Sequence, residues 1–256
     1  MKEAHDPGSP RTPPELELEG LSTGGPPHQI ASLEEYLKIV EDPLSFLFRG
    51  VPCVQYYLVP SVARRWKEGT FPLLKLERKL LMEFKRRAFP WLSHFRPVND
   101  WDWLMLAQHH GVPTRLLDWT TNPLVALFFA CRGGDGTQNG VVYVARSLPR
   151  LETDVRQSDV PNVEEDYYIA PPHISPRIPA QAACFTVSKN PAEPFNRYVE
   201  RSIIVRARLK QDLLDRIGRY GLTEGALFPD LDGLGRELEE EADSEKLAYT
   251  NPCRPA

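Results

Sequence analysis

Residues 108–131 read QHHGVPTRLLDWTTNPLVALFFAC and place polar side chains directly before an apolar run. Gly111 and Pro113 are typical of a helix end, so DWDWLMLAQHH at 100–110 is predicted to be a helix that stops there. Asn122 and Pro123 are typical of a helix start, and the apolar residues that follow are expected in the core. We interpret residues 114–121, between these two helices, as a turn held by its own hydrogen bonds, from which one or two side chains reach a cleft.

Outward from this stretch, helices are expected mainly in the first half of the chain and strands mainly in the second. Ser32 and Glu35 have capping-box spacing before a helix, FLFRGV at 46–51 is extended in character, and residues 72–89 have amphipathic helical spacing. The strand-like runs GVVYVAR, ACFTVSK and RSIIVRARL begin at 140, 183 and 201, and KQDLLDRIGRYG at 210–221 returns to helical spacing. This order predicts an α+β single domain with a mainly antiparallel sheet.

Composition bounds the domain organisation and the class of protein. The 256 residues suffice for one domain, and a formal charge of -4 argues against a protein built mainly as a cationic clamp on nucleic acid. The Pro- and Gly-rich residues 1–29 are expected to be a flexible leader, 30–240 the domain, and 241–256 an acidic or disordered tail, into which an acidic helix from residue 235 runs. The four cysteines form no CxxC pair, and no signal peptide or membrane span is visible, which predicts a cytoplasmic protein without a metal site.

Five stretches together resemble the successive motifs of the FRG-domain family, which is named for its Phe-Arg-Gly tripeptide. They are FRGV at 48–51, PSVARRW at 60–66, WDWLMLAQHHGVPTRLLDWTTNPLVALFFA at 101–130, HISPRIPAQAACFTV at 173–187 and LFPDLDGL at 227–234. The resemblance runs over about residues 45–234. It implies a bacterial protein, often associated with phage or mobile elements, and no assigned reaction.

A second resemblance is to ADP-ribosyltransferases, which carry an arginine in a strand-borne FRG or YRG, a Ser-Thr-Ser strand before a short helix, and a late catalytic glutamate. The matching stretches are FRG at 48–50, DWTTNPLVALFFA at 118–130, in which both serines are replaced, and TEGALFP at 223–229. This resemblance implies an ADP-ribosyltransferase-like fold and an NAD-dependent transferase or NAD glycohydrolase of the phage-defence or toxin type. Its catalytic residue would be Glu224.

The chemistry of NAD suggests a role for each residue type. A guanidinium makes planar, bidentate contacts with phosphate, so Arg49 is expected to hold the dinucleotide while Gly50 lets the backbone approach. A carboxylate such as Glu224 would stabilise positive charge on the ribose, and Thr120 or Thr121 would form a hydrogen bond within the cleft. The other residues expected to bind the dinucleotide are His109, Thr114, Arg115, Asp118, Arg177 and Gln181.

Each of these residues also has a structural interpretation. Arg49 could bridge a buried carboxylate such as that of Asp118, which could itself be a local hydrogen-bond acceptor. One of the adjacent histidines 109 and 110 could cap the last helical carbonyls, and Glu224 could cap or flank a turn. Arg177 and Gln181, in a proline-rigidified loop before a strand, could satisfy loop carbonyls rather than contact a ligand.

Two other classes of function stay open beside the NAD-dependent enzyme. A nucleic-acid-binding or nuclease-like effector could use basic runs such as RRWK at 64–67 together with the aromatic residues Trp66, Trp91, Trp101 and Trp103, although those aromatics are more simply core. A non-enzymatic interaction module would recruit a partner through the leader or the acidic helix. The predicted partners are NAD, a protein or nucleic-acid acceptor, and an antitoxin or other effector partner.

Overall fold

The computed structural model describes residues 26–42, 47–54, 58–64, 72–92, 96–133, 136–146, 148–151 and 163–250. The expected leader as far as residue 25, and the basic run at 65–67, lie outside these residues. The strands are β1 His28–Ile30, β2 Leu47–Val51, β3 Leu116–Thr120, β4 Gly140–Ala145, β5 Tyr167–Ile169, β6 Ala183–Val187 and β7 Val199–Val205. The helices are α1 Leu33–Val40, α2 Ser61–Arg64, α3 Leu73–Ala88, α4 Asp100–His109, α5 Pro123–Cys131, α6 Arg177–Ala180, α7 Lys210–Gly218, α8 Glu224–Leu227 and α9 Leu231–Thr250, with short 3-10 turns at Phe89–Trp91 and Ala207–Leu209.

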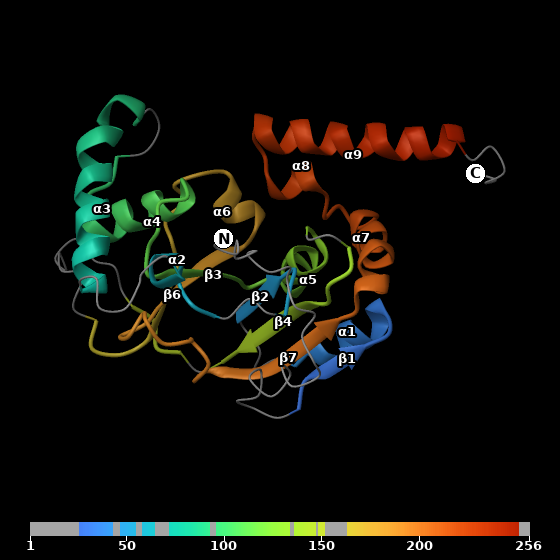
Figure 1. Ribbon diagram of the computed structural model, residues 1–256, viewed down its shortest axis with the longest axis horizontal. Coiled ribbons are helices and arrows are strands. Elements are labelled where there is room, and N and C mark those ends of the chain that lie inside the picture. Colours follow the sequence, from blue (N-terminus) through green and yellow to red (C-terminus); the bar gives the residue numbers. More distant parts are fainter. Residues whose placement is uncertain are drawn as a thin grey trace, which may run out of the picture.

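All seven strands belong to one sheet, in the order β1-β7-β4-β2-β3-β6-β5 (Figure 1). Every pairing is antiparallel except that of β1 with β7. The predicted α+β domain with a mainly antiparallel sheet is therefore confirmed. The strand β1 begins at His28, so the last two residues of the expected leader are part of the sheet.

The sheet is nearly divided between β2 and β3. Five residue pairs join β2 to β4, and five join β3 to β6, but only Phe48 and Thr120 pair across β2 and β3. Beyond that pair the two strands separate. The backbone groups and side chains next to it, Arg49 on β2 and Asp118 on β3, therefore meet at a gap in the ladder and not at a regular pairing position.

Three clusters of buried residues cover the sheet on its two faces. Phe48 of β2 packs with α1, α5 and α7, whereas Leu116 of β3 packs with α3, α4 and α6. These two clusters lie on one face of the sheet. A third cluster, which includes Leu47 and Val51 of β2 and Trp119 of β3, lies on the other face. Because side chains alternate along a strand, Phe48 and Gly50 point toward α5, and Arg49 starts from the opposite face with Leu47 and Val51.

Local sequence signals explain several element ends. The hydroxyl of Ser32 accepts from the Glu35 amide at 3.3 Å, as the capping box predicted, and Glu35 in turn accepts from the Ala31 amide at 2.7 Å. Gly111, after α4, has a φ of 74°, the left-handed conformation expected of a glycine that ends a helix. The helix end predicted at Gly111 and the helix start predicted at Asn122 are thus both correct.

The interpretation of residues 114–121 as a turn is wrong for most of its length, because residues 116–120 form β3 in the interior of the sheet. Its polar residues Asp118 and Thr120 lie at the divided part of the sheet, where the strand pattern is not purely apolar. The acidic helix expected from residue 235 corresponds to α9, which begins at Leu231 and continues to Thr250. Residues 251–256 lie outside the described part.

Candidate functional site

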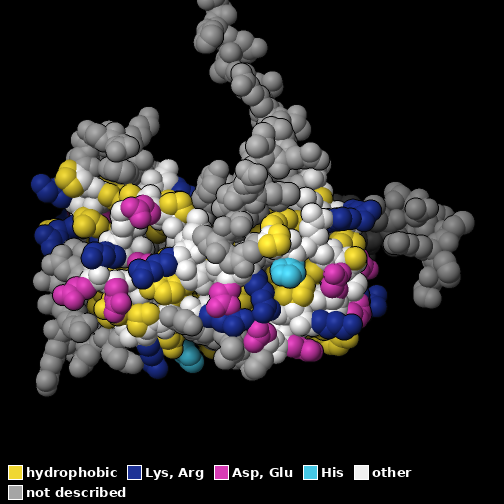
Figure 2. All heavy atoms as spheres, turned by 90° about the horizontal axis from the view of Figure 1, so that it is seen from below, with side chains coloured by type: hydrophobic (Ala, Val, Ile, Leu, Met, Phe, Trp, Pro, Cys, Tyr) yellow, Lys and Arg dark blue, Asp and Glu magenta, His cyan; other side chains and the backbone are white. Residues whose placement is uncertain are grey.

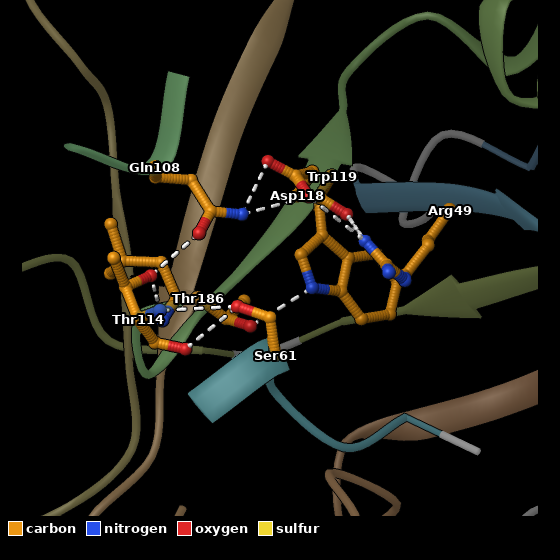
Figure 3. A network of polar contacts seen from close by, with 8 residues as sticks. Arg49, Ser61, Gln108, Thr114, Asp118, Trp119 and Thr186 are labelled. Atoms are coloured by element: carbon orange, nitrogen blue, oxygen red, sulfur yellow. Dashed lines mark hydrogen bonds and ion pairs between the residues drawn. The ribbon is translucent and has the colours of Figure 1, made fainter. Parts of the chain in front are cut away.

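The side chain of Arg49 lies at the separation of β2 and β3 and is directed toward Asp118 (Figure 3). It is 15% exposed, and it donates from Nη1 to the main-chain carbonyl of Asp118. The carboxylate of Asp118 is 3.7 Å from Nη1 and is 60% exposed. The Nε of Arg49 is buried and has no hydrogen-bond partner among the described residues. Asp118 is thus the partner that the structural interpretation named, but its carboxylate is not buried.

Electrostatics at Arg49 reflect this incomplete pairing. Burial lowers the pKa of Arg49 from its ordinary value, Asp118 acts in the opposite direction, and the positive charge of Arg64 lowers the pKa further. The group stays charged near neutral pH, because an arginine titrates far above that range. The site therefore holds a largely desolvated positive charge that its protein neighbours compensate only in part.

A chain of hydrogen bonds orients Asp118 (Figure 3). The amide nitrogen of Gln108 donates to both carboxylate oxygens, at 3.0 and 3.1 Å, and its oxygen accepts from the Thr114 hydroxyl at 2.6 Å. The Thr114 amide in turn donates to the Ser61 hydroxyl at 3.1 Å. Gln108 and Ser61 were not among the predicted site residues; the position of Gln108, three residues before the Gly111 helix end, was the available signal.

The close packing of α5 on β2 explains why residue 50 is a glycine. A Cβ atom at this position would lie 1.8 Å from the main-chain oxygen of Ala126 in α5. The absence of a side chain lets α5 pack directly on β2, on the face opposite to the one from which Arg49 starts. The expectation that Gly50 admits the backbone to a dinucleotide is therefore corrected: the backbone that it admits is that of α5.

Arg115 and Thr114 are interior residues. The Arg115 side chain is 1% exposed and forms an ion pair with Glu77 of α3, whose side chain is 4% exposed. The Arg115 amide also donates to Glu77, at 2.8 Å. Thr114 is buried, and its hydroxyl accepts from the Leu116 amide at 3.1 Å. Both were predicted to bind the dinucleotide; the structure instead uses them to fasten the start of β3 to α3 and α4.

Thr120 and Thr121 lie where β3 meets the loop before β6. The buried Thr120 hydroxyl donates to the Gln181 carbonyl at 2.7 Å and accepts from the Asn122 amide at 3.0 Å, so its hydrogen bonds are local. The exposed Thr121 donates its amide to the Ala182 carbonyl at 3.0 Å. Ala182 has a φ of 44°, the only positive φ of a described non-glycine residue. Backbone strain of this kind is concentrated at functional positions, which keeps this corner within the candidate site.

Gln181 and Arg177 contact the segment 227–230. The Gln181 amide nitrogen donates to the Leu227 carbonyl at 2.9 Å, which is the loop-satisfying contact of the structural interpretation. Arg177 forms an ion pair with Asp230 at 2.5 Å, and its guanidinium carbon lies 5.1 Å from the centre of the Phe228 ring. This side chain is 27% exposed and could still reach a ligand by exchanging its carboxylate partner.

His109 is the half-buried member of the histidine pair, and His110 is the exposed residue that caps α4. Burial lowers the pKa of His109, and the nearby His110 and Arg177 lower it further. Asp230 and Asp118 act in the opposite direction, which places His109 in the field of both carboxylates. The imidazole is therefore neutral near pH 7.

Glu224 is placed differently from the expected catalytic carboxylate. Its side chain is 1% exposed, and Oε1 accepts at 2.5 Å from both Arg132, at the end of α5, and Arg236 of α9. Oε2 is buried without a hydrogen-bond partner among the described residues. The described contacts of Glu224 join it to α5 and α9 and not to Arg49. Its two arginine partners could not be predicted from the sequence, since they lie 92 and 12 residues away.

Three features of the described part of the chain concern metal ligands, thiols and membrane-spanning helices. No group of three His, Cys, Asp or Glu side chains there could hold a metal ion. Burial raises the pKa values of Cys131 and Cys184 to about 12, so these thiols stay protonated and weakly nucleophilic. No helix in the same residues is long and apolar enough to cross a membrane.

The aromatic and basic side chains considered for nucleic-acid binding are partly buried and partly exposed. Of the aromatics considered for base stacking, Trp101 and Trp103 are buried core residues, whereas Trp91 is 83% exposed. Trp66 lies outside the described residues. Figure 2 shows one face of the molecule on which Lys and Arg side chains alternate with Asp and Glu, so that face offers no continuous basic track.

The protein is an α+β domain with a mainly antiparallel sheet that is nearly divided in two, and an arginine lies on one of the two strands at the division. Residues 44–138 match the family model described as FRG domain, which confirms the first family resemblance over that part of the chain. The matched residues include Arg49, Gln108 and Asp118. No curated protein and no solved structure matches the chain.

Proposed function

We propose that the FRG domain binds a phosphate-bearing ligand of the dinucleotide class at Arg49, and that NAD is its substrate. The guanidinium of Arg49 carries this proposal: it is 15% exposed, its nearest carboxylate is 3.7 Å away, and Nε has no partner among the described residues. An arginine left in this condition destabilises the free protein unless an anion completes its hydrogen bonds. Phosphate oxygens fit the planar set of donors.

The carboxylate that serves this site is Asp118 in our proposal, because Glu224 is buried in two ion pairs. Asp118 is 60% exposed beside Arg49, and Gln108 fixes its orientation. In the proposed reaction the bond between the ribose C1' and the nicotinamide nitrogen breaks, and its electron pair leaves with nicotinamide. Water or a macromolecular nucleophile forms the new bond at C1' and releases a proton. Asp118 stabilises the positive charge that develops on the ribose.

Binding is tested first, by isothermal titration calorimetry with NAD. Wild type and Arg206→Ala, which removes an exposed arginine paired with Gln29, should bind alike. Arg49→Ala should bind at least about thirtyfold more weakly, because loss of a contact to a desolvated charge costs on the order of 2–5 kcal/mol. Equal affinity of the Arg49→Ala and wild-type proteins would remove the proposed site.

The reaction is tested by chromatographic detection of nicotinamide, with and without protein and nucleic-acid acceptors. We expect Asp118→Asn to abolish nicotinamide release and Glu224→Gln to retain it wherever the variant is folded by circular dichroism. The reverse result would return the catalytic role to Glu224. NAD binding with no release by wild type under any acceptor would leave a dinucleotide-binding module and end the transferase proposal.

We further propose that this activity belongs to a bacterial effector of phage defence or to a toxin, an expectation that rests on the family resemblance. Expression of the wild-type chain in a bacterial host should then slow growth, and Arg49→Ala should relieve the effect at equal protein level. Equal growth inhibition by both proteins would separate any toxicity from the Arg49 site.

A further inference from the structure

The helix α9 has an apolar stripe that the described part of the chain leaves exposed. Its contacts with the domain are made mainly near its beginning, where Arg236 bonds Glu224 and Glu237 lies against Gly225. Figure 1 shows the helix continuing outward from α8 along the edge of the molecule. Leu231, Leu234 and Leu238 are 84%, 47% and 54% exposed, and their spacing of three and four residues places them on one face.

The charge of α9 restricts what can cover this stripe. Residues 231–250 contain seven acidic and two basic residues, and the exposed Glu241 follows Leu238 on the leucine side of the helix. Two copies of α9 packed against each other would bring like charges together, which is unfavourable. The stripe therefore fits a basic helix that also has an apolar section.

The same chain offers such a helix in α3, at the other end of the molecule in Figure 1. Residues 73–88 contain six basic and two acidic residues. An open groove of about 480 Å³ lies on this helix, and its described lining is Lys75, Arg78, Lys79, Met82, Glu83 and Arg86. Met82 is 64% exposed, and Phe89 and Trp91, just beyond the helix end, are 67% and 83% exposed.

The two helices match when they run antiparallel. On α3 the basic residues Lys75 and Lys79 lie toward the start and the apolar Phe89 lies at the end. On α9 the order is reversed, with Leu231 at the start and Glu241 farther along. The distance from Lys79 to Phe89 and that from Leu231 to Glu241 are each ten residues, about 15 Å along a helix axis. Antiparallel packing therefore sets Leu231 against Phe89, Leu238 against Met82 and Glu241 against Lys79.

We propose that α9 of one copy docks on the α3 groove of a second copy of this chain, so that the protein self-associates through α3–α9 pairs. Reciprocal docking gives a closed dimer with two such pairs. The association depends on charge, and it weakens as salt screens the exposed ions. It is independent of the Arg49 site.

The full chain is examined by sedimentation velocity over a range of concentrations at low and high salt. Wild type should form dimers at low salt and dissociate at high salt. Glu241→Lys and Lys79→Glu should each weaken the dimer by about tenfold, since each reversal acts in both pairs. The double variant should recover most of the association. Glu239→Lys, an equal change on another face of α9, should leave it unchanged.

Three outcomes would overturn the proposal. A wild-type chain that is monomeric at every concentration and low salt shows no such docking. Dimers that Leu238→Gln disrupts but Lys79→Glu does not would place the stripe against something other than α3. Failure of the double variant to regain association would show that Lys79 and Glu241 do not face each other. Circular dichroism of each variant separates these results from unfolding.

Discussion

Replacing Arg49 with methionine should stabilise the ligand-free protein while it removes NAD binding. The gross attraction between Nη1 and the Asp118 carboxylate, 3.7 Å apart, is about 4.5 kcal/mol at an effective dielectric constant of about 20, and solvent around the 60%-exposed carboxylate reduces it. Against it stands the desolvation of the guanidinium, several kcal/mol for a buried ion. Asp118 remains hydrated in the variant, so no buried charge is left alone.

We therefore expect Arg49→Met to raise the free energy of unfolding by about 1–2 kcal/mol, the lower part of the range for apolar replacement of a poorly compensated ion. For a chain of this length this corresponds to about 2–4 °C of melting temperature per kcal/mol. Urea unfolding and thermal melting without ligand measure it. A variant that melts below wild type would refute the reasoning and make Arg49 a structural residue.

Arg115→Met is the matched control for this prediction. Its partner Glu77 is as inaccessible as Arg115 itself, so the substitution leaves a buried carboxylate without its cation. A loss of about 3–5 kcal/mol is expected. The change from arginine to methionine should thus raise the free energy of unfolding at position 49 and lower it at position 115.

Three further variants test the geometry. Gly50→Ala places a Cβ 1.8 Å from a carbonyl of α5 and should cost about 1–3 kcal/mol or more, measured by urea unfolding; an unchanged midpoint contradicts the close packing. Ala182→Gly, at a φ of 44°, should stabilise by up to about 1 kcal/mol, and a destabilised variant would show that the alanine is not strained. The Arg177 hydrogen bond lowers the pKa of Asp230 to about 2, so stability from this carboxylate is present above its ordinary value near 3.8 and is lost as the pH falls toward about 2. Asp230→Asn should flatten that part of the pH–stability curve, and parallel curves would contradict the ion pair.

The sequence predicts those parts of the fold whose signals are local. The capping box at Ser32, the glycine that ends α4, and the β-branched runs of β4, β6 and β7 all act within a few residues. It fails at β3 because Asp118 and the threonines around it resemble a turn, and their place in a sheet depends on pairing with β6, more than 60 residues later. The parallel pairing of β1 with β7 is likewise nonlocal.

The candidate site was predictable as a set of residue types but not as an arrangement. The structural interpretation of Arg49 named Asp118 as its partner, and the two side chains do meet, although the carboxylate is exposed. Glu224 was chosen because TEGALFP resembles the segment of the late glutamate in ADP-ribosyltransferases, yet its surroundings are set by Arg132 and Arg236, which no local pattern connects to it. Sequence spacing can identify a candidate carboxylate, but whether solvent reaches that carboxylate depends on the packing of distant segments around it.

The arginines of this domain differ in how closely a carboxylate compensates their positive charge. Arg115, Arg132, Arg177 and Arg236 each have a carboxylate oxygen within bonding distance, and the latter three also lie within 5.1 Å of the Phe228 ring centre. Arg49 bonds a main-chain carbonyl instead, and its carboxylate is farther away at 3.7 Å. An arginine whose task is to hold two segments together gains from a close carboxylate, but one that must bind phosphate cannot be fully neutralised beforehand. The incomplete pairing of Arg49 is the condition that phosphate binding requires.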